Sequence, residues 1–106
     1  MNWLIVDEIA EQVFNSMNGD ADQINNGDCA VFAKKMSNML AEKGIEHTIK
    51  VTESFELEDE LEGYEYEVSE YAWRLSHCYV VVGDYGFDAY NLRGEEESEM
   101  TYINKL

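Results

Sequence analysis

The period at which apolar residues recur changes once along this chain of 106 residues, near residue 45. Before that point, apolar residues recur every three or four positions in two stretches, residues 2–17 and 29–43, which is the period of an amphipathic helix. After it, apolar and polar residues alternate, which is the period of a strand with one buried face. The sequence therefore predicts α+β architecture: N-terminal helices packed on a small antiparallel sheet, in a single domain spanning residues 1–106.

Local signals mark the ends of the two predicted helices. The polar stretch NGDADQINNG, residues 18–27, predicts that the first helix ends there and that a loop follows. Asp28 is of a type that caps helices, so the second helix is predicted to open at Cys29. Gly44 suits the left-handed position that closes many helices, and Ile45 can supply the apolar contact of a Schellman ending.

The alternating half of the chain divides into several strands. Residues 45–54 alternate as a strand does, and YEYEV, residues 64–68, alternates like an edge strand. From Leu75, LSHCYVVVGD predicts a buried strand, GDYG a turn, and FDAYNL the returning partner of a hairpin. Residues 55–62 fit either a helical turn or an exposed loop, and MTYIN, residues 100–104, predicts one more short strand.

Acidic residues outnumber basic ones by 23 to seven, which gives a formal charge of −16. This charge disfavours direct contact with nucleic acid or an anionic membrane and favours a basic partner. Nine of the acids lie in residues 53–70, and no Lys or Arg lies between Lys50 and Arg74. The stretch is interpreted either as a solvated face or as a surface that imitates a phosphate backbone or docks a basic protein.

Several features concern the compartment and the chemistry of the chain. No apolar run approaches the ~20 residues of a membrane span, and the acidic start lacks the positive region of a secretion signal. The two cysteines, Cys29 and Cys78, are too few for a disulfide framework and fit no metal-ligand spacing. We therefore expect a cytoplasmic, reduced protein that uses no cofactor and no metal.

Cys29 is the first candidate for chemistry, because it is expected at the N-terminus of a helix. The thiolate is the nucleophilic form of cysteine, and the N–H groups and dipole of a helix N-terminus favour it. Asp28 opposes ionisation through its own charge unless its carboxylate is engaged in capping. The alternative interpretation is that Cys29 is one more buried apolar residue, as free cysteines often are.

His77 opens the predicted buried strand and is the candidate base. Strand alternation gives the two faces different side chains: His77, Tyr79 and Val81 on one, and Cys78, Val80 and Val82 on the other. If the Cys29 helix packs on the first face, a contact between Cys29 and His77 becomes possible, and His77 could deprotonate the thiol. The alternative is a histidine at a strand end that is satisfied by a backbone carbonyl. The second histidine, His47, is interpreted as structural or surface, and Cys78 as core.

A third polar group would hold the His77 ring in one tautomer. Asp88, on the returning strand, is acidic and close to the turn. Asn91 lies opposite His77 if the hairpin closes through a three-residue loop, whereas a two-residue turn at Asp84–Tyr85 sets Leu92 there. Strand spacing leaves the register, and with it the choice between Asp88 and Asn91, open.

GDCAVFAKKMSNML followed by HCYVVVGDYGFDAYNLRG resembles papain-like cysteine peptidases and their relatives, including small bacterial and phage members, cell-wall amidases and transglutaminase-like domains. The resemblance covers residues 23–94. It implies a papain-like core in which the nucleophilic Cys begins a helix and the His begins a strand of an antiparallel sheet. Carried over by position, Cys29 would be the nucleophile, His77 the base and Asp88 the orienting residue. Gln23, six residues before Cys29, stands at the offset of an oxyanion-hole glutamine.

Two functions from different classes are compatible with these residues. The first is a cysteine hydrolase or transferase that acts on an amide bond of a basic peptide or protein. The second is an acidic inhibitor or binding protein, of phage type for instance, in which residues 53–70 mimic nucleic acid or dock a basic protein partner. In the second case Cys29 and His77 would have no chemical role.

Overall fold

The computed structural model describes residues 3–24, 28–53, 55, 58–71 and 76–100. Its elements follow the predicted order, with helices before strands. They are α1 (Trp3–Ser16), α2 (Ala21–Gln23), α3 (Cys29–Glu42), β1 (Thr48–Val51), η2 (Glu58–Leu61), β2 (Tyr66–Val68), β3 (Cys78–Val82), β4 (Tyr85–Asp88), β5 (Asn91–Glu96) and η3 (Glu97–Glu99). The predicted α+β class is confirmed.

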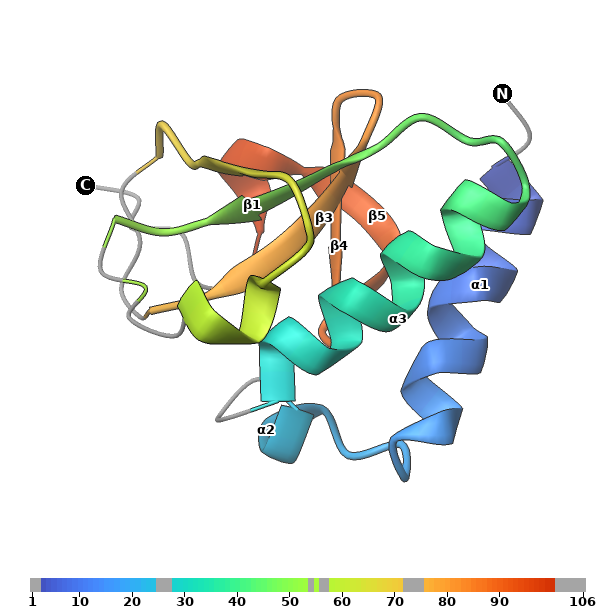
Figure 1. Cartoon of the computed structure of the whole chain (residues 1–106). Coiled ribbons are helices and arrows are strands. Elements are labelled where there is room, and N and C mark those ends of the chain that lie inside the picture. The colour runs from blue at the N-terminus through green and yellow to red at the C-terminus, as the bar shows by residue number, and fades with distance from the viewer. Residues whose placement is uncertain (1–2, 25–27, 54, 56–57, 72–75, 101–106) are drawn as a thin grey trace.

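The strands form one sheet in the order β2-β1-β3-β4-β5. The pairs β1–β3, β3–β4 and β4–β5 are antiparallel, as predicted, whereas β1 and β2 are parallel. The sheet is mixed because the connection between β1 and β2, which contains η2, is long enough to carry the chain back to the end where β1 begins. Figure 1 shows α1 and α3 over one face of the sheet, so the main core forms on that face.

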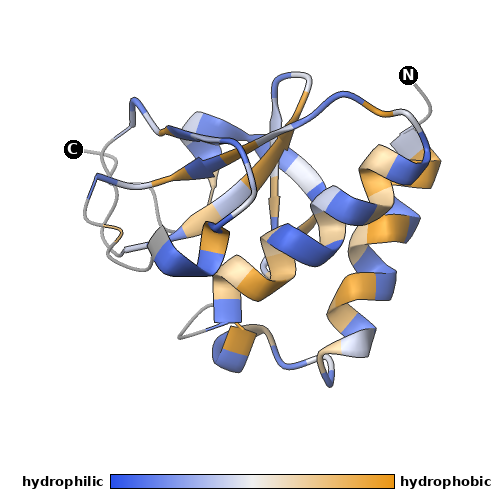
Figure 2. Ribbon diagram, viewed as in Figure 1, coloured by the Kyte–Doolittle hydropathy of each residue, from blue (hydrophilic) through white to orange (hydrophobic). Residues whose placement is uncertain are grey.

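Helix α3 buries one apolar side against the sheet. Phe32, Met36 and Leu40, at steps of four residues, are almost fully buried, as helical spacing requires of side chains on one face. They share a core with Cys78 and Val80, alternate residues of β3. Figure 2 shows apolar and polar patches that recur along α3. The helical spacing of the apolar residues in the sequence therefore accounts for the packing of this helix.

Both ends of α3 lie where the sequence predicts. The helix begins directly after Asp28, although within the described turn the Asp28 side chain makes no capping hydrogen bond. At the other end, Gly44 has a φ of +70°, and its N–H donates to the carbonyl of Ala41 at 3.0 Å. The N–H of Ile45 donates to the carbonyl of Leu40, also at 3.0 Å. These two bonds form the predicted Schellman motif.

The stretch after α1 contains more structure than the predicted loop. Residues 21–23 form the short helix α2, and its N-cap Asp20 accepts a hydrogen bond at Oδ1 from the N–H of Gln23 at 3.1 Å. Ile24 is buried in the main core. The loop prediction was wrong here because the Asp20 cap and the burial of Ile24 fix a helical turn. In the acidic segment, η2 likewise selects the helical-turn alternative and buries Leu61.

The hairpin after His77 is present, but its register differs from both predicted registers. The β3–β4 pairing closes through a two-residue turn at Gly83–Asp84. Extending this register places residue 90 opposite His77, so the predictions of Asn91 or Leu92 at that position were both wrong. The register is therefore shifted by one residue from the first prediction and by two residues from the second.

The predicted returning strand, residues 87–92, is two strands. β4 ends at Asp88, and β5 begins at Asn91 and runs antiparallel to β4. The Asp88 side chain accepts a hydrogen bond at Oδ1 from the N–H of Tyr90 at 2.9 Å. A carboxylate that binds the backbone two residues later forms a local turn, and this turn interrupts the strand.

The other predicted strands are shorter in the structure or lie outside the described residues. β1 occupies only the centre of the predicted 45–54 strand, and β2 occupies the last three residues of the predicted edge strand. Two predicted segments fall outside the described residues. They are the strand at 100–104, except for Met100, and the start of the buried strand at residue 75. Within the described ranges, no helix is long and apolar enough to cross a bilayer.

Candidate active site

Cys29 is the first residue of α3, and its side chain is 6% exposed. The N–H groups in the first turn of a helix lack partners within that helix and carry the positive end of its dipole. They therefore favour negative charge on a sulfur at this position. Asp28 opposes that charge, because its carboxylate is not engaged in capping the described first turn.

His77 lies directly before β3 and is held by β1. Its N–H donates to Oγ1 of Thr52 at 3.1 Å, and its carbonyl accepts a hydrogen bond from the N–H of Thr52 at 3.0 Å. Thr52 is itself buried. The paired bonds fix the backbone of His77 at the end of the central strand, so its ring has a defined place at that end of the sheet.

The imidazole of His77 is paired with the carboxylate of Asp88. The distance between Nε2 of His77 and Oδ2 of Asp88 is 2.8 Å, and the two side chains are 1% and 2% exposed. A carboxylate accepts only, so Nε2 donates and carries a proton in this arrangement. The Asp88 carboxylate thereby fixes which ring nitrogen is left for another partner.

The Cys29 thiol is, beside Asp88, the second group that raises the pKa of His77. Burial by itself lowers the pKa of His77, but the hydrogen bonds and negative charges of Asp88 and Cys29 outweigh burial and raise the pKa to about 9. The ring therefore holds its second proton at neutral pH.

The meeting of these three side chains does not follow the predicted route. The condition for a contact was that α3 pack on the sheet face of Tyr79. Instead α3 shares its core with Cys78 and Val80, on the opposite face, and Tyr79 belongs to a separate cluster. Cys29 and His77 lie at the same end of the sheet because His77 precedes β3 and α3 begins at that end of the strand.

The second oxygen of Asp88 is also satisfied. Besides the N–H of Tyr90, Nδ2 of Asn91 donates to Oδ1 of Asp88 at 2.7 Å. The two candidates for the third position thus have different places: Asp88 contacts His77, and Asn91 contacts Asp88. Three donors surround the buried Asp88 carboxylate and hold it in one orientation beside the His77 ring.

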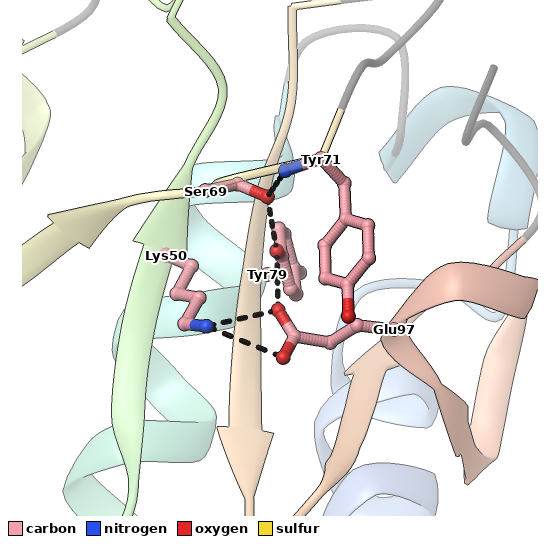
Figure 3. A network of polar contacts seen from close by, with 5 residues as sticks. All are labelled: Lys50, Ser69, Tyr71, Tyr79 and Glu97. Carbon is pink, nitrogen blue, oxygen red and sulfur yellow. Dashed lines mark hydrogen bonds and ion pairs between the residues drawn. The ribbon is translucent and has the colours of Figure 1, made fainter.

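Figure 3 shows a polar network on the sheet face away from the helices, and Tyr79 connects this network to His77. The ring of Tyr79 stacks near-parallel to that of His77, with centroids 6.1 Å apart. The Tyr79 hydroxyl donates to Oε1 of Glu97 at 2.8 Å and lies 2.8 Å from Oγ of Ser69. Lys50 binds both oxygens of Glu97, at 3.1 and 3.2 Å. The network joins β1, β3 and η3 behind the site.

The remaining cysteine and histidine have structural places. Cys78 is buried in the main core, and burial, with the negative charges of Cys29 and Glu60, raises the pKa of its thiol so far that it stays protonated. Nδ1 of His47 donates to the carbonyl of Ile45 at 2.8 Å, and its Nε2 lies 2.6 Å from the hydroxyl of Ser37. These contacts agree with the structural interpretation of His47 and the core interpretation of Cys78.

Gln23 lies in α2 with an exposed side chain, outside the buried cluster of Cys29, His77 and Asp88. Within the described ranges, no group of three His, Cys, Asp or Glu side chains is arranged to hold a metal ion. No family model, curated protein or solved structure matches this chain. The geometry of the three side chains therefore carries the functional argument.

Proposed function

We propose that this chain is a small papain-like cysteine hydrolase or transferase that acts on an amide bond. Cys29 is the nucleophile, His77 the base and Asp88 the orienting residue. The observation that carries the proposal is a buried imidazole that has Asp88 at 2.8 Å on Nε2 and whose pKa is raised by Asp88 and by Cys29, a thiol at a helix N-terminus. A nucleophile, a base and a group that orients the base are the parts that such chemistry needs.

In the proposed reaction the Cys29 proton has already moved to His77 before the substrate is attacked, in keeping with the raised pKa of the ring. The sulfur then attacks the carbonyl carbon of the amide, and the oxyanion that forms accepts a hydrogen bond from the N–H of Cys29, with Gln23 as the proposed second donor. His77 returns the proton to the leaving amine, and a thioester remains. Water or a second amine attacks the thioester through His77, which releases a carboxylic acid or a new amide and restores the thiol.

The charge of the chain favours a cationic substrate, such as a basic peptide or protein. A formal charge of −16 attracts cations toward the molecule and repels polyanions. Both described cysteines are free thiols, which suits the reducing cytoplasm, where glutathione keeps such a nucleophile active.

Thiol alkylation across pH tests the proposal. In a Cys78→Ala background, Cys29 is expected to react with iodoacetamide well below pH ~8.5, the reference for free cysteine. Its rate should fall at least about tenfold in His77→Gln and in Asp88→Asn, because each removes part of the relay. Circular dichroism establishes that each variant is folded. A rate that follows the free-cysteine curve, or that neither variant changes, contradicts the proposal.

A non-enzymatic acidic binding protein is the second candidate function. Most of the described acids of residues 53–70 are exposed, including Glu62, Glu65, Glu67 and Glu70, so they are available to a basic partner. Such a protein would bind in a strongly salt-dependent manner and would keep its activity in Cys29→Ala. Loss of activity in a folded Cys29→Ala variant would instead support the enzyme.

A further inference from the structure

β2 forms one edge of the sheet, and no described strand pairs with its outer side. All three of its residues are exposed, and the apolar side chains of Val68 and Tyr66 are exposed to 57% and 37%. An exposed edge strand with apolar side chains is a template for pairing with another extended chain. This edge is therefore a candidate docking surface.

The backbone of β2 is oriented for such pairing. The N–H of Ser69 donates to the carbonyl of Val51 in β1 at 2.7 Å, so the backbone groups of Ser69 face inward. Backbone groups of successive residues in a strand face opposite sides, so those of Glu67 also face β1. Tyr66 and Val68 then direct their N–H and C=O groups away from the sheet, where an added strand would bind.

The side chains of β2 are sorted by type between the two faces of the sheet. Val68 pairs with Val51, whose side chain lies in the core under the helices, so Tyr66 and Val68 project on that face. Glu65 and Glu67 project on the other face. An open hollow of about 470 Å³ adjoins them, lined by His47, Thr48, Glu65, Tyr66 and Glu67.

We propose that β2 accepts an extended basic peptide as an additional strand, in which Lys or Arg alternates with apolar residues. The apolar side chains of the peptide would lie beside Tyr66 and Val68, and its cations beside Glu65 and Glu67. Opposite charges on neighbouring strands stabilise their pairing. Nucleic acid is repelled by these carboxylates, and a second copy of the chain would bring the same glutamates together at −16 per molecule.

The docked peptide would extend toward the candidate active site. Val68 is aligned with Val51, and Val51 with Cys78, the residue after His77. The end of β2 at Val68 therefore lies at the same end of the sheet as His77, two strands away, or roughly 10 Å. That the peptide is the substrate of Cys29 rests on the proposed function, whereas its docking on β2 does not.

A labelled octapeptide of alternating lysine and valine tests the docking by fluorescence anisotropy. Its affinity should fall about tenfold in the Glu65→Gln/Glu67→Gln double variant. The matched control, Glu8→Gln/Glu11→Gln, removes the same charge from exposed positions of α1 and should change affinity less than twofold. Val68→Pro, which removes an outward N–H, should weaken binding at least tenfold, with folding verified by circular dichroism. A peptide of the same composition with its four lysines contiguous should bind at least fivefold more weakly.

Equal losses in the two double variants, or equal binding of the two peptides, would overturn the docking. Unchanged peptide binding in Val68→Pro would also overturn the docking, and so would tighter binding of a 20-base-pair DNA duplex than of the peptide.

The same peptide is then incubated with the wild-type chain and with Cys29→Ala. Docking without cleavage by either would overturn the substrate role and leave the docking in place. Cleavage that needs Cys29, with β2 variants showing unchanged KM, would overturn the docking and leave the proposed function in place.

Discussion

At the scale of single residues, the Asp88 carboxylate decides the state of the site. It binds Nε2 of His77 with one oxygen and accepts hydrogen bonds from Tyr90 and Asn91 with the other. Burial of a histidine alone would favour the neutral ring. The raised pKa of His77 thus depends on negative charge beside it, and this dependence can be tested with one substitution.

Replacing Asp88 with Asn should return the pKa of His77 from about 9 to its ordinary value of 6.5 or below. The variant keeps an acceptor of similar shape but removes the charge that outweighs burial. Titration of the imidazole resonances by NMR measures the change. His47 serves as the internal control, because its hydrogen-bond partners are Ser37 and Ile45 and not Asp88. A His77 resonance that still titrates near pH 9 would show that Asp88 does not set its charge.

Asn91→Ala should lower the free energy of unfolding by about 1–3 kcal/mol, because it removes a hydrogen bond to a buried carboxylate. Asn38→Ala is the matched control. Asn38 accepts a hydrogen bond from the Tyr64 hydroxyl on the surface, and alanine suits its helical position better, so little or no loss is expected. Urea unfolding of both variants measures the difference, and equal effects would rule out a special role for Asn91.

The sequence singled out Cys29 and His77 as candidates, and Asp88 over Asn91 through the resemblance alone, but it did not point to the residues that hold them. Cys29 and His77 each stand where a pattern begins, and local patterns are visible in one sequence. Thr52 follows β1 and His77 precedes β3, and their pairing depends on long-range register, which alternation does not specify. Asn91 is a rival of Asp88 in the sequence because strand spacing predicts which face of the sheet a residue occupies. It does not predict a local turn in which a side chain binds the backbone, as Asp88 does.

At the scale of elements, local chemistry predicted α3 better than it predicted the hairpin. The helix has a period of nearly four, an acidic residue before its start and a glycine after its end, and these signals agree. The hairpin register depends on which of the residues Gly83–Gly86 form the turn. Several choices suit this stretch equally, so the sheet pairing had to decide.

Two glycines with similar backbone conformation test how much packing adds to backbone strain. Gly44 has a φ of +70° with open space where a Cβ would lie, so Gly44→Ala should cost about 1 kcal/mol. Gly94 has a φ of +79°, and a Cβ there would lie 2.6 Å from the ring of Phe87, a fully buried residue. Gly94→Ala should therefore cost about 1–3 kcal/mol more. Chemical denaturation compares them, and equal costs would contradict the close packing of β5 on Phe87.

At the scale of the whole molecule, the charge and the buried imidazole act on stability in different pH ranges. The carboxylates are the source of the −16 charge. A carboxylate whose pKa is near the reference value is already almost fully ionised at pH 6.5. Their mutual repulsion is then nearly constant between pH 6.5 and 9. His77 is the group whose raised pKa, about 9, spans this window. A change in stability within it therefore reports on the buried site.

The free energy of unfolding should fall by about 2–3 kcal/mol between pH 6.5 and pH 9. The folded chain holds a proton on His77 more tightly than the unfolded chain, whose histidine has the ordinary value of 6.5. The stabilisation is thus complete below pH 6.5 and is lost as pH rises through about 9. Urea unfolding in the Cys29→Ser/Cys78→Ala background, which removes both thiols from the titration while a hydroxyl takes the place of the Cys29 sulfur, measures this slope. In the additional Asp88→Asn variant the slope should vanish, because His77 then binds its proton no more tightly in the folded chain than in the unfolded one. An unchanged slope in that variant would assign the pH dependence to other groups and remove the support for a charged imidazole in the site.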